Sequence, residues 1–374
     1  MNPAHVPTVE IESLAEWDAR IGSAEAIAGW VVQSVDLSQR AADLNRVDPE
    51  GAILLGCELP DGLADDLLER GALIFPRLPH VPFDAYRATL YSPAELYDGI
   101  IDGQLYAHTT DAAIYSWAKS LPAPEDLASS LAMTLHDHAV TDALEELMAG
   151  IDPARTVGLM GGHALPRGSD DYVGAARLAS QLTLSGYTVL TGGGPGAMEA
   201  ANLGAYLAGE YAVLSNAIDQ LSAAPDWQGN QTMWVATALD IRAQTAATGR
   251  SIGVPTWFYG HEPSNVFATA IAKYFSNALR EDLLLQHCRG GLIYLPGAAG
   301  TVQEVFQAAT ANYYSADPHL VCPMIFVGVD YWTHQLPVWP LVEELGRGRT
   351  MGERLLLVDD VDEAVKYLNG RLRG

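Results

Sequence analysis

At 374 residues the chain is longer than an ordinary single domain, and its length predicts two or three domains. With 49% hydrophobic and 18% charged residues it can bury a sizeable core, which excludes a disordered protein. Its 46 acidic and 21 basic residues give a formal charge of −25, which argues against binding to nucleic acid or to an anionic membrane, because both attract basic side chains. A small phosphorylated ligand remains compatible, since a few arginines and backbone amides can bind one phosphate.

The cysteine count and the absence of apolar runs point to a cytoplasmic protein. Cys57, Cys288 and Cys322 are too few and too widely spaced for a disulfide framework or a zinc ribbon. The first residues lack the charged and apolar regions of a signal peptide, and no run approaches the roughly 18 apolar residues of a membrane span. His136 and His138 are two apart in a predicted helix and point to opposite faces, so we expect no metal there.

Residues 1–150 predict an accessory domain of smaller α/β and helical elements. Short apolar runs at 51–57 and 72–75 lie between turn residues and are typical of buried strands, and 62–70 has a helical pattern. Residues 124–148 predict one or two helices. We find no internal repeat in this region.

Residues 151–374 predict the larger domain, because strands, glycine-rich turns and helices alternate from about residue 155. Strands are expected at 156–160, 188–191, 251–259, 292–295, 324–327 and 355–358. Helices are expected at 172–184, 197–207, 263–287 and 360–368, with another starting near Thr301. This alternation predicts a Rossmann-like, doubly wound α/β fold with a mostly parallel sheet. Such sheets bind ligands beyond the carboxyl ends of their strands, where the glycine-rich turns fall.

The first glycine loop, residues 192–196, joins a predicted strand to a predicted helix. It matches neither the dinucleotide fingerprint nor a P-loop. Its glycines would still let a ligand approach the backbone closely, and Gly193, Gly194, Met198 and Glu199 are candidate substrate-binding residues. The alternative is a plain turn in which Glu199 favours the positive end of the helix. The sequence of this loop does not decide between the two.

The second loop runs directly into a helix and carries candidates for a phosphate site. The amides of Gly297, Ala298, Ala299, Gly300 and Thr301 would point outward at the helix N-terminus, where an anion is favoured.

Glu304 lies one turn further along that helix. A carboxylate there would suit a sugar carbon that becomes cationic when its glycosidic bond breaks. The alternative is a capping box, in which Thr301 and Glu304 satisfy the amides of their own helix. On this tetrapeptide alone the cap is favoured.

A third candidate is Arg280, on the helix expected at 263–287. An apolar stripe of spacing four predicts the buried face of that helix: Phe267, Ile271, Phe275 and Leu279. Arg280 falls on another face and is placed to reach the mouth formed by the two glycine loops. The alternative is a solvated helix face on which Arg280 neighbours Glu281 and Asp282.

Together these elements resemble a known family. A Gly-Gly-Gly-x-x-x-Met loop, an arginine-bearing helix and Pro-Gly-Gly-x-Gly-Thr-x-x-Glu, in this order, are similar to the Lonely Guy family of nucleoside 5′-monophosphate phosphoribohydrolases, once misnamed lysine decarboxylases. The resemblance covers roughly residues 156–327 of what would be a larger form with an extra N-terminal domain. Matching residues of the second motif are Pro296, Gly297, Gly300, Thr301 and Glu304. The chain departs from the family at Ala298, where glycine is usual, and at Glu281, where lysine usually follows the arginine.

The resemblance implies a reaction and roles for these residues. The 5′-phosphate would lie on the amides of 297–301, Glu304 would contact the ribose, and Arg280 would orient the phosphate or assist departure of the base. The first loop would form the opposite wall. The products would be a free base and ribose 5-phosphate, without a metal or other cofactor, in a homodimer.

Two further residues follow the first strand of this domain, at the edge where ligands bind. Gly162 and His163 are candidate substrate contacts, although a structural role for His163 is equally compatible with the sequence. Arg167 is a candidate phosphate or inter-subunit contact. Two other functions use the same residues: a nucleotide sensor without catalysis, and an N-ribosyl transferase whose acceptor is not water.

Overall fold

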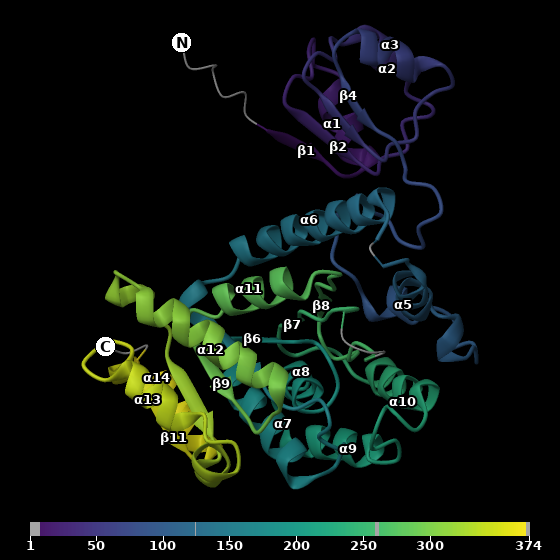
Figure 1. Cartoon of the computed structure of the whole chain (residues 1–374). Coiled ribbons are helices and arrows are strands. Elements are labelled where there is room, and N and C mark those ends of the chain that lie inside the picture. Colours follow the sequence, from purple (N-terminus) through teal and green to yellow (C-terminus); the bar gives the residue numbers. More distant parts are fainter. Residues whose placement is uncertain (1–7, 124, 259–261, 372–374) are drawn as a thin grey trace. The chain divides into compact units, whose positions relative to one another are not determined.

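The computed structural model describes residues 8–123, 125–258 and 262–371 (Figure 1). By its internal contacts the chain divides into two units. The first comprises Met1–Thr89 and Lys119–Ala143, and the second Leu90–Ala118 and Leu144–Gly374. The domain boundary expected at residue 150 stays a prediction, and the contacts add that the segment from Leu90 to Ala118 packs within the second unit.

The first unit contains a parallel sheet of four short strands in the order β1-β2-β3-β4. Its elements are β1 (Val9–Ile11), α1 (Leu14–Ile21), β2 (Trp30–Gln33), α2 (Ala41–Arg46), β3 (Ile53–Leu55), α3 (Leu63–Glu69) and β4 (Leu73–Phe75). The strands expected at 51–57 and 72–75 and the helix at 62–70 are confirmed in shorter form. Sequential parallel strands joined by helices bury one continuous apolar stack, in which Ile11, Val32 and Leu54 occupy equivalent positions.

The expectation that the N-terminal region has no internal repeat is wrong. Paired residues advance by 21, 22 and 20 positions from strand to strand, from Val9 to Trp30, Val31 to Ile53 and Ile53 to Leu73. One glycine precedes each later strand: Gly29, Gly51 and Gly71. Each has a positive φ, and the amide of each of the first two bonds to the carbonyl of the next. The repeat is carried by these glycines and by apolar positions of changing identity, which sequence letters alone do not reveal.

The second unit is built on a seven-stranded sheet in the order β11-β10-β9-β5-β6-β7-β8, parallel in every pair (Figure 1). Its strands are β5 (Thr156–Met160), β6 (Thr188–Thr191), β7 (Ser251–Gly253), β8 (Ala270–Ile271), β9 (Gly291–Tyr294), β10 (Met324–Val327) and β11 (Leu355–Val358). Its helices are α4 (Pro93–Leu96), α7 (Asp170–Leu184), α8 (Ala197–Tyr206), α9 (Tyr211–Leu221), α10 (Gln231–Gln244), α11 (Asn277–His287), α12 (Ala299–Tyr314), α13 (Trp339–Gly346) and α14 (Val361–Arg371). The doubly wound α/β fold is confirmed.

Two further helices, α5 (Thr110–Ser120) and α6 (Leu127–Ala149), each contain a boundary between the units. Residues 124–148 were expected to form one or two helices, and the described part forms the single helix α6. Pro124, where that expectation began, lies outside the described residues.

The strand order contains one reversal, and it fixes where a ligand can bind. The chain proceeds from β5 to β6, β7 and β8 on one side, and from β9 to β10 and β11 on the other. At the junction of β5 and β9 the following loops turn to opposite faces of the sheet, which leaves a crevice at their carboxyl ends. Helices α7 and α8 pack together beside β6, whereas α11 packs with α12.

One element expected from the sequence is wrong: residues 263–276 do not form the first half of a long helix. The structure has the short strand β8 there, and the helix begins only at Asn277. The backbone amides of Thr269 and Ala272 bond to carbonyls of Ser251 and Gly253, so they belong to a sheet edge. Nearly every side chain from 264 to 275 is buried, and a stripe of spacing four therefore carries no helical information. The end of the preceding expected strand, Tyr259, lies outside the described residues.

The segment Leu90–Ala118 holds this sheet edge in place. Tyr91 and Ile271 exchange two backbone hydrogen bonds. Asp111 accepts a bond of 2.6 Å from the Lys273 ammonium and one of 3.0 Å from Trp257 Nε1, all three side chains being buried. Tyr97 donates its hydroxyl to the carbonyl of Ser264.

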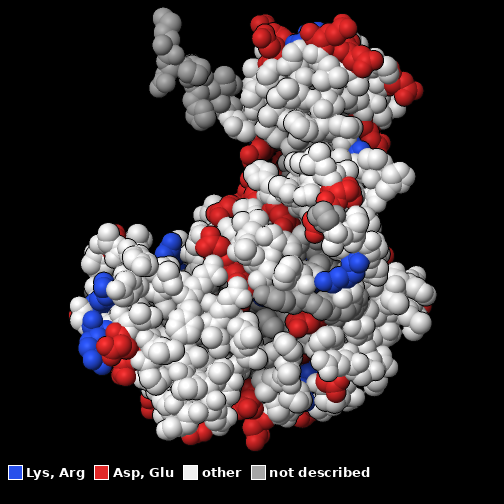
Figure 2. Space-filling view, in the orientation of Figure 1, with Lys and Arg blue, Asp and Glu red and all other residues white. Residues whose placement is uncertain are grey.

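On the face drawn in Figure 2, acidic side chains are more widespread than basic ones, and some of them lie over α3 of the first unit. This distribution follows from the formal charge of −25. None of the helices in the described ranges combines the length and apolar character that crossing a membrane requires.

Candidate functional site

The loops after β5 and β9 meet at the reversal of the sheet. The amide of Gly162 bonds to the carbonyl of Pro296 at 3.0 Å, and the amide of Ala197 bonds to the carbonyl of Gly162 at 3.0 Å. A Cβ on Gly297 would lie 2.2 Å from Thr301 Oγ1 and 3.0 Å from the Gly162 nitrogen. Only glycine therefore fits at position 297, because real Cβ atoms do not approach so closely.

Helix α12 begins with amides that its own side chains do not cap. Ala298 is its N-cap residue and makes no side-chain cap bond. The amides of Ala299, Gly300 and Thr301 belong to the first turn, where no carbonyl of the helix can reach them. Residues 298–300 are exposed, so these amides face the open side of the loop.

The capping-box interpretation of Thr301 and Glu304 is wrong. Thr301 is the third residue of α12, two residues after the helix begins at Ala299, so it cannot act as the N-cap. Glu304 is one turn too deep in the helix to reach back to an N-cap amide. Both side chains are buried and turned toward the loop and the neighbouring helix α11.

The alanine that departs from the family pattern is compatible with the loop. Ala298 has φ −100° and ψ −148°, outside the left-handed region that favours glycine. Its backbone therefore does not require glycine.

Arg280 and Glu304 form a buried ion pair. The distance between Arg280 Nη1 and Glu304 Oε1 is 3.2 Å, and their side chains are 9% and 8% exposed. Glu281 Oε1 lies 3.7 Å from the same Nη1 and shares the positive charge. Gln303 donates to Glu281 from the other side. Arg280 Nε is buried and has no hydrogen-bond partner among the described residues.

The surroundings of Glu304 shift its protonation. Burial raises the pKa of its carboxyl, and the negative charge of Glu281 adds to the rise, while the Arg280 guanidinium opposes it. Burial disfavours the charged form of a carboxyl, and a neighbouring cation favours it. The net direction is upward, so Glu304 binds a proton more readily than an ordinary glutamate.

A cavity of about 610 Å³ opens over this pair and the start of α12. The predicted site residues that line it are Gly162, His163, Met198, Arg280, Gly297, Ala298, Ala299, Gly300, Thr301 and Glu304. The structure therefore brings both loops, the arginine and the glutamate to one place. Glu262 and Tyr331 also line the cavity, as do Glu281 and Gln303, and no motif in the sequence places these four side chains there. Tyr331 donates its hydroxyl to the carbonyl of Gly297 at 2.6 Å.

Two residues of the first loop, Gly193 and Gly194, lie behind the cavity wall. The amide and side chain of Asn265 bond to their carbonyls, at 2.8 Å to Gly193 and 3.0 Å to Gly194. Gly193 has φ +70°, and a Cβ there would lie 2.6 Å from the ring of Pro255. These glycines shape the wall, and the side chain that reaches the cavity from this loop is Met198.

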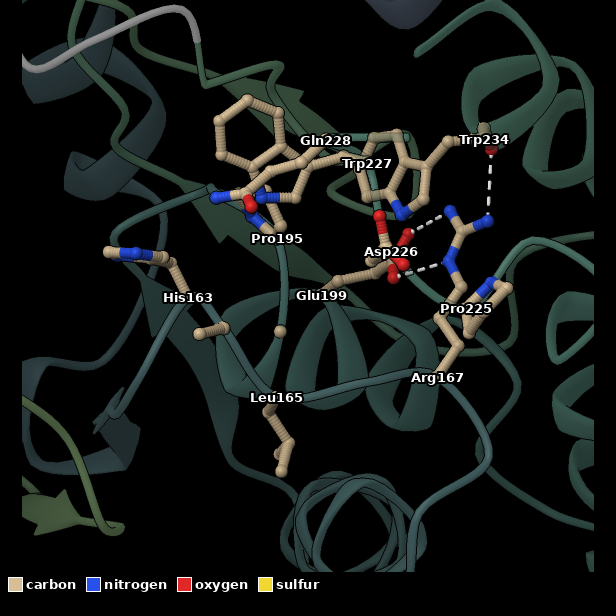
Figure 3. Close-up of a pocket in the computed structure, with 12 residues that line it drawn as sticks. His163, Leu165, Arg167, Pro195, Glu199, Pro225, Asp226, Trp227, Gln228 and Trp234 are labelled. Atoms are coloured by element: carbon tan, nitrogen blue, oxygen red, sulfur yellow. Dashed lines mark hydrogen bonds and ion pairs between the residues drawn. The ribbon is translucent and has the colours of Figure 1, made fainter. Parts of the chain in front are cut away.

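Glu199, the remaining predicted substrate contact, is placed elsewhere. It is fully buried and forms a two-pronged ion pair with Arg167, with bonds of 2.8 Å and 2.5 Å (Figure 3). Tyr172 donates to the same carboxylate at 3.1 Å.

Arg167 in turn is held by three other groups. It donates to the carbonyls of Ala224 and Trp234, and its guanidinium lies 4.2 Å from the centre of the Trp234 ring. The pair lines a smaller pocket of about 70 Å³ with Pro195 and Trp227 (Figure 3).

No group of three or more His, Cys, Asp or Glu side chains suited to a metal ion occurs within the described part of the chain. His136 is buried in α6 against Asp137, with 3.1 Å between ring nitrogen and carboxylate, and contacts the ring of Phe83.

A family model described as "possible lysine decarboxylase" matches residues 238–368, which include Arg280, the second glycine loop and Glu304. The matched residues include the motif that resembles the Lonely Guy family. The comparison with curated proteins gave no match.

Similar solved structures include two molybdenum cofactor proteins and one structural-genomics target. The molybdenum cofactor binding protein of Rippkaea orientalis is 15% identical, with 58% of this chain and 96% of that chain covered and a TM-score of 0.35. The molybdenum cofactor carrier protein of Chlamydomonas reinhardtii is 17% identical, covering 59% and 98%, with a TM-score of 0.37. The structural-genomics target is 18% identical, covering 57% and 99%, with a TM-score of 0.37.

Proposed function

We propose that the protein hydrolyses the N-glycosidic bond of a nucleoside 5′-monophosphate, releasing a free base and ribose 5-phosphate. One observation carries the proposal: a buried carboxylate paired with an arginine lies one helical turn from uncapped amides, and all of them line one cavity. Amides and a helix N-terminus bind phosphate, and a carboxylate stabilises a cationic sugar carbon. The spacing suits a ligand that carries both groups.

The amides of Ala299, Gly300 and Thr301 would bind the 5′-phosphate. They have no acceptor within the helix and belong to residues that line the cavity, and the partial positive charge of the helix N-terminus favours the dianion. The Thr301 hydroxyl adds a donor at the same place. A nucleoside without the phosphate would lose these contacts.

Glu304 would act on the ribose. As the bond from C1′ to the base breaks, positive charge develops on the ring, and an adjacent carboxylate stabilises it. The same carboxylate can take a proton from the attacking water. The Arg280 guanidinium opposes the rise that burial causes in the Glu304 pKa, and its Nε, which has no partner among the described residues, would be a further donor to the ligand.

The proposal is tested by incubating the purified protein with each common nucleoside 5′-monophosphate and with its matching nucleoside. Released base is quantified by chromatography. We expect base from at least one monophosphate and none from its nucleoside. Equal release from both would contradict the phosphate site. Release of base together with a sugar product other than ribose 5-phosphate would identify a transferase instead.

The oligomeric state of the protein and its location in the cell stay predictions. The homodimer that the family resemblance implies is checked by light scattering of the purified full-length chain. The cytoplasmic location expected from the sequence is checked by fractionation.

A further inference from the structure

The cavity contains a second carboxylate, Glu262, that the Glu304 mechanism does not use. It lies just before the segment 263–276 that forms the sheet edge. His163, from the loop after β5, lines the same cavity, and its Nδ1 lies 3.4 Å from Glu262 Oε1. The His163 side chain is 46% exposed and that of Glu262 is 25% exposed. The imidazole is therefore open to the cavity on one side and held by a half-buried carboxylate on the other.

This arrangement determines which ring nitrogen can exchange a proton with a ligand. A carboxylate at Nδ1 fixes the proton on that nitrogen and leaves Nε2 directed away from the carboxylate. In Figure 3 the His163 ring points away from the Arg167–Glu199 pair. A carboxylate behind an imidazole also stabilises the protonated ring, as in catalytic dyads and triads.

Glu262 and Glu304 are separate groups that line the same cavity, and Arg280 also lines it. Arg280 contacts Glu304 directly, and its charge also acts on Glu262. Around Glu262 the charged groups are His163, Arg280 and the buried Lys273; around Glu304 they are Arg280 and Glu281. Two carboxylates with different partners in one site can take different roles, one as a base and one behind an acid.

We propose that His163, held by Glu262, is the general acid that protonates the base as it leaves. This inference rests on the proposed hydrolysis and deepens it. The bond between C1′ and the base nitrogen breaks, and its electron pair goes to the base. The proton of His163 Nε2 passes to a ring nitrogen of the base. Water forms the new bond to C1′ and gives a proton to Glu304, and solvent then returns a proton to His163.

The local electrostatics support the pairing. Burial raises the pKa of Glu262, and the positive charges of His163, Arg280 and Lys273 oppose that rise. The positive charges that face this carboxyl therefore favour its ionised form. An ionised carboxylate 3.4 Å from an imidazole nitrogen is placed to hold the ring while the other nitrogen gives a proton to a leaving base.

The experiment uses two nucleotides that differ in their need for an acid. In guanosine 5′-monophosphate the guanine leaves as an anion unless it is protonated. In the N7-methylated nucleotide the base ring is already positive, so the base leaves as a neutral molecule. We would measure kcat/KM of the wild type, His163→Asn and Glu262→Gln for both nucleotides. His334→Asn is the matched control, because His334 also pairs with a carboxylate but lies outside the cavity lining.

We expect His163→Asn to lower kcat/KM for the ordinary nucleotide by about a hundredfold or more and for the methylated one by less than about fivefold. Glu262→Gln is expected to show the same selectivity with a smaller loss, since it acts through His163. Equal losses on both nucleotides, or a loss confined to KM, would overturn the inference and indicate a role in binding the base.

A second readout applies to whichever nucleotide the wild type cleaves. A general acid must be protonated, so kcat/KM of the wild type should fall as the pH rises. His163→Asn should remove this basic limb, and its persistence would overturn the inference. A wild type that releases no base from any nucleotide would overturn the proposed function itself. If the wild type is active but His163→Asn loses the same factor on both nucleotides, only the role of His163 would be overturned.

Discussion

The second unit contains two buried arginine–glutamate pairs, which differ in how fully their hydrogen-bonding groups are satisfied. Both glutamates lie on a helix that follows a glycine loop, and all four side chains are nearly or fully buried. The Arg167–Glu199 pair is doubly bonded and surrounded by carbonyls, a tyrosine hydroxyl and the Trp234 ring. The Arg280–Glu304 pair makes one contact of 3.2 Å and lines a cavity, and Arg280 Nε has no hydrogen-bond partner within the described part of the chain.

This difference shows that burial and ion pairing alone do not distinguish a catalytic ion pair from a structural one. A complete pair has no bonding capacity left for a ligand, and disturbing it costs stability. An incomplete pair that faces a cavity keeps that capacity for a substrate. The comparison supports the proposal that Arg280 and Glu304 are catalytic, whereas Arg167 and Glu199 join the loop after β5 to α8.

The largest expected effect is on activity, in Arg280→Ala. Without the guanidinium, the pKa of Glu304 would rise further, because burial and Glu281 would act unopposed. Glu304 would then be protonated over a wider range of pH than in the wild type. We expect kcat/KM to fall by about a thousandfold, roughly 4 kcal/mol in the barrier. Base release at several pH values checks this, and Arg289→Ala, outside the cavity lining, is the control. Full activity in Arg280→Ala would contradict the proposed catalytic role of the Arg280–Glu304 pair.

Arg167→Lys tests whether the Arg167–Glu199 pair stabilises the fold. Lysine keeps the charge but cannot supply the two-pronged bond to Glu199 or the contact with Trp234. We expect a loss of about 3 kcal/mol in the free energy of unfolding, measured by denaturant titration. The control is Arg177→Lys, whose exposed ion pair with Asp362 should change stability by less than about 0.5 kcal/mol. An unchanged midpoint in Arg167→Lys would contradict the structural role.

Thr301→Val probes the phosphate end of the working site. The change removes a hydroxyl and keeps the shape of the side chain. We expect KM for the nucleotide to rise about tenfold, because a bond to a charged group contributes roughly 1.5 kcal/mol or more. The rise should disappear for a ligand without a phosphate, measured by its inhibition of the reaction. An equal change for both ligands would place the phosphate elsewhere.

The pH dependence of the wild type sharpens the assignment of Glu304. Its carboxyl must be ionised to act, and its pKa is raised by burial and Glu281. Activity should therefore fall on acidification beginning above the range of an ordinary glutamate, about pH 4.3, and by about tenfold for each unit below the Glu304 pKa. A rate profile of kcat/KM over pH 4 to 8, with stability checked at each pH, tests this. A constant kcat/KM down to pH 4 would argue against Glu304 as the base.

The smallest effect is expected for Ala298→Gly, which restores the residue usual in the family. Because Ala298 has an ordinary φ of −100°, glycine relieves no backbone strain. We expect kcat/KM to change by less than about threefold. A large gain would show that the alanine methyl crowds the phosphate.

Much of the second unit follows from its sequence because local pattern and tertiary structure agree there. The runs at 156–160 and 292–295 are apolar, buried and central in the sheet, and the glycine loops follow them directly. The segment 263–276 could not be predicted in this way. Its uniform burial imitates the spacing of a helix, while its backbone is bonded to Ser251, Gly253 and Tyr91, far away in the sequence.

The same reasoning explains which site residues were missed. Glu304 and the second loop lie in a compact motif that Arg280 precedes, so the family resemblance could single these residues out, and their roles stay predictions. Glu262 has no motif and becomes a neighbour of His163 only through the fold. Glu199 lies in a motif, but its carboxylate forms an ion pair with Arg167, which is 32 residues away in the sequence. The glycine repeat of the first unit also remained hidden, because equivalent positions hold different apolar residues.

The most direct test is to measure activity and stability side by side in Glu304→Gln and Glu199→Gln. Each change removes one buried carboxylate charge from an arginine and keeps the size of the side chain. We predict that Glu304→Gln loses base release by at least about a hundredfold with an unfolding midpoint close to that of the wild type. We predict that Glu199→Gln keeps its activity within about threefold while folded and unfolds at a clearly lower temperature. The reverse pattern, or equal losses in both variants, would contradict the assignment of catalysis to Glu304.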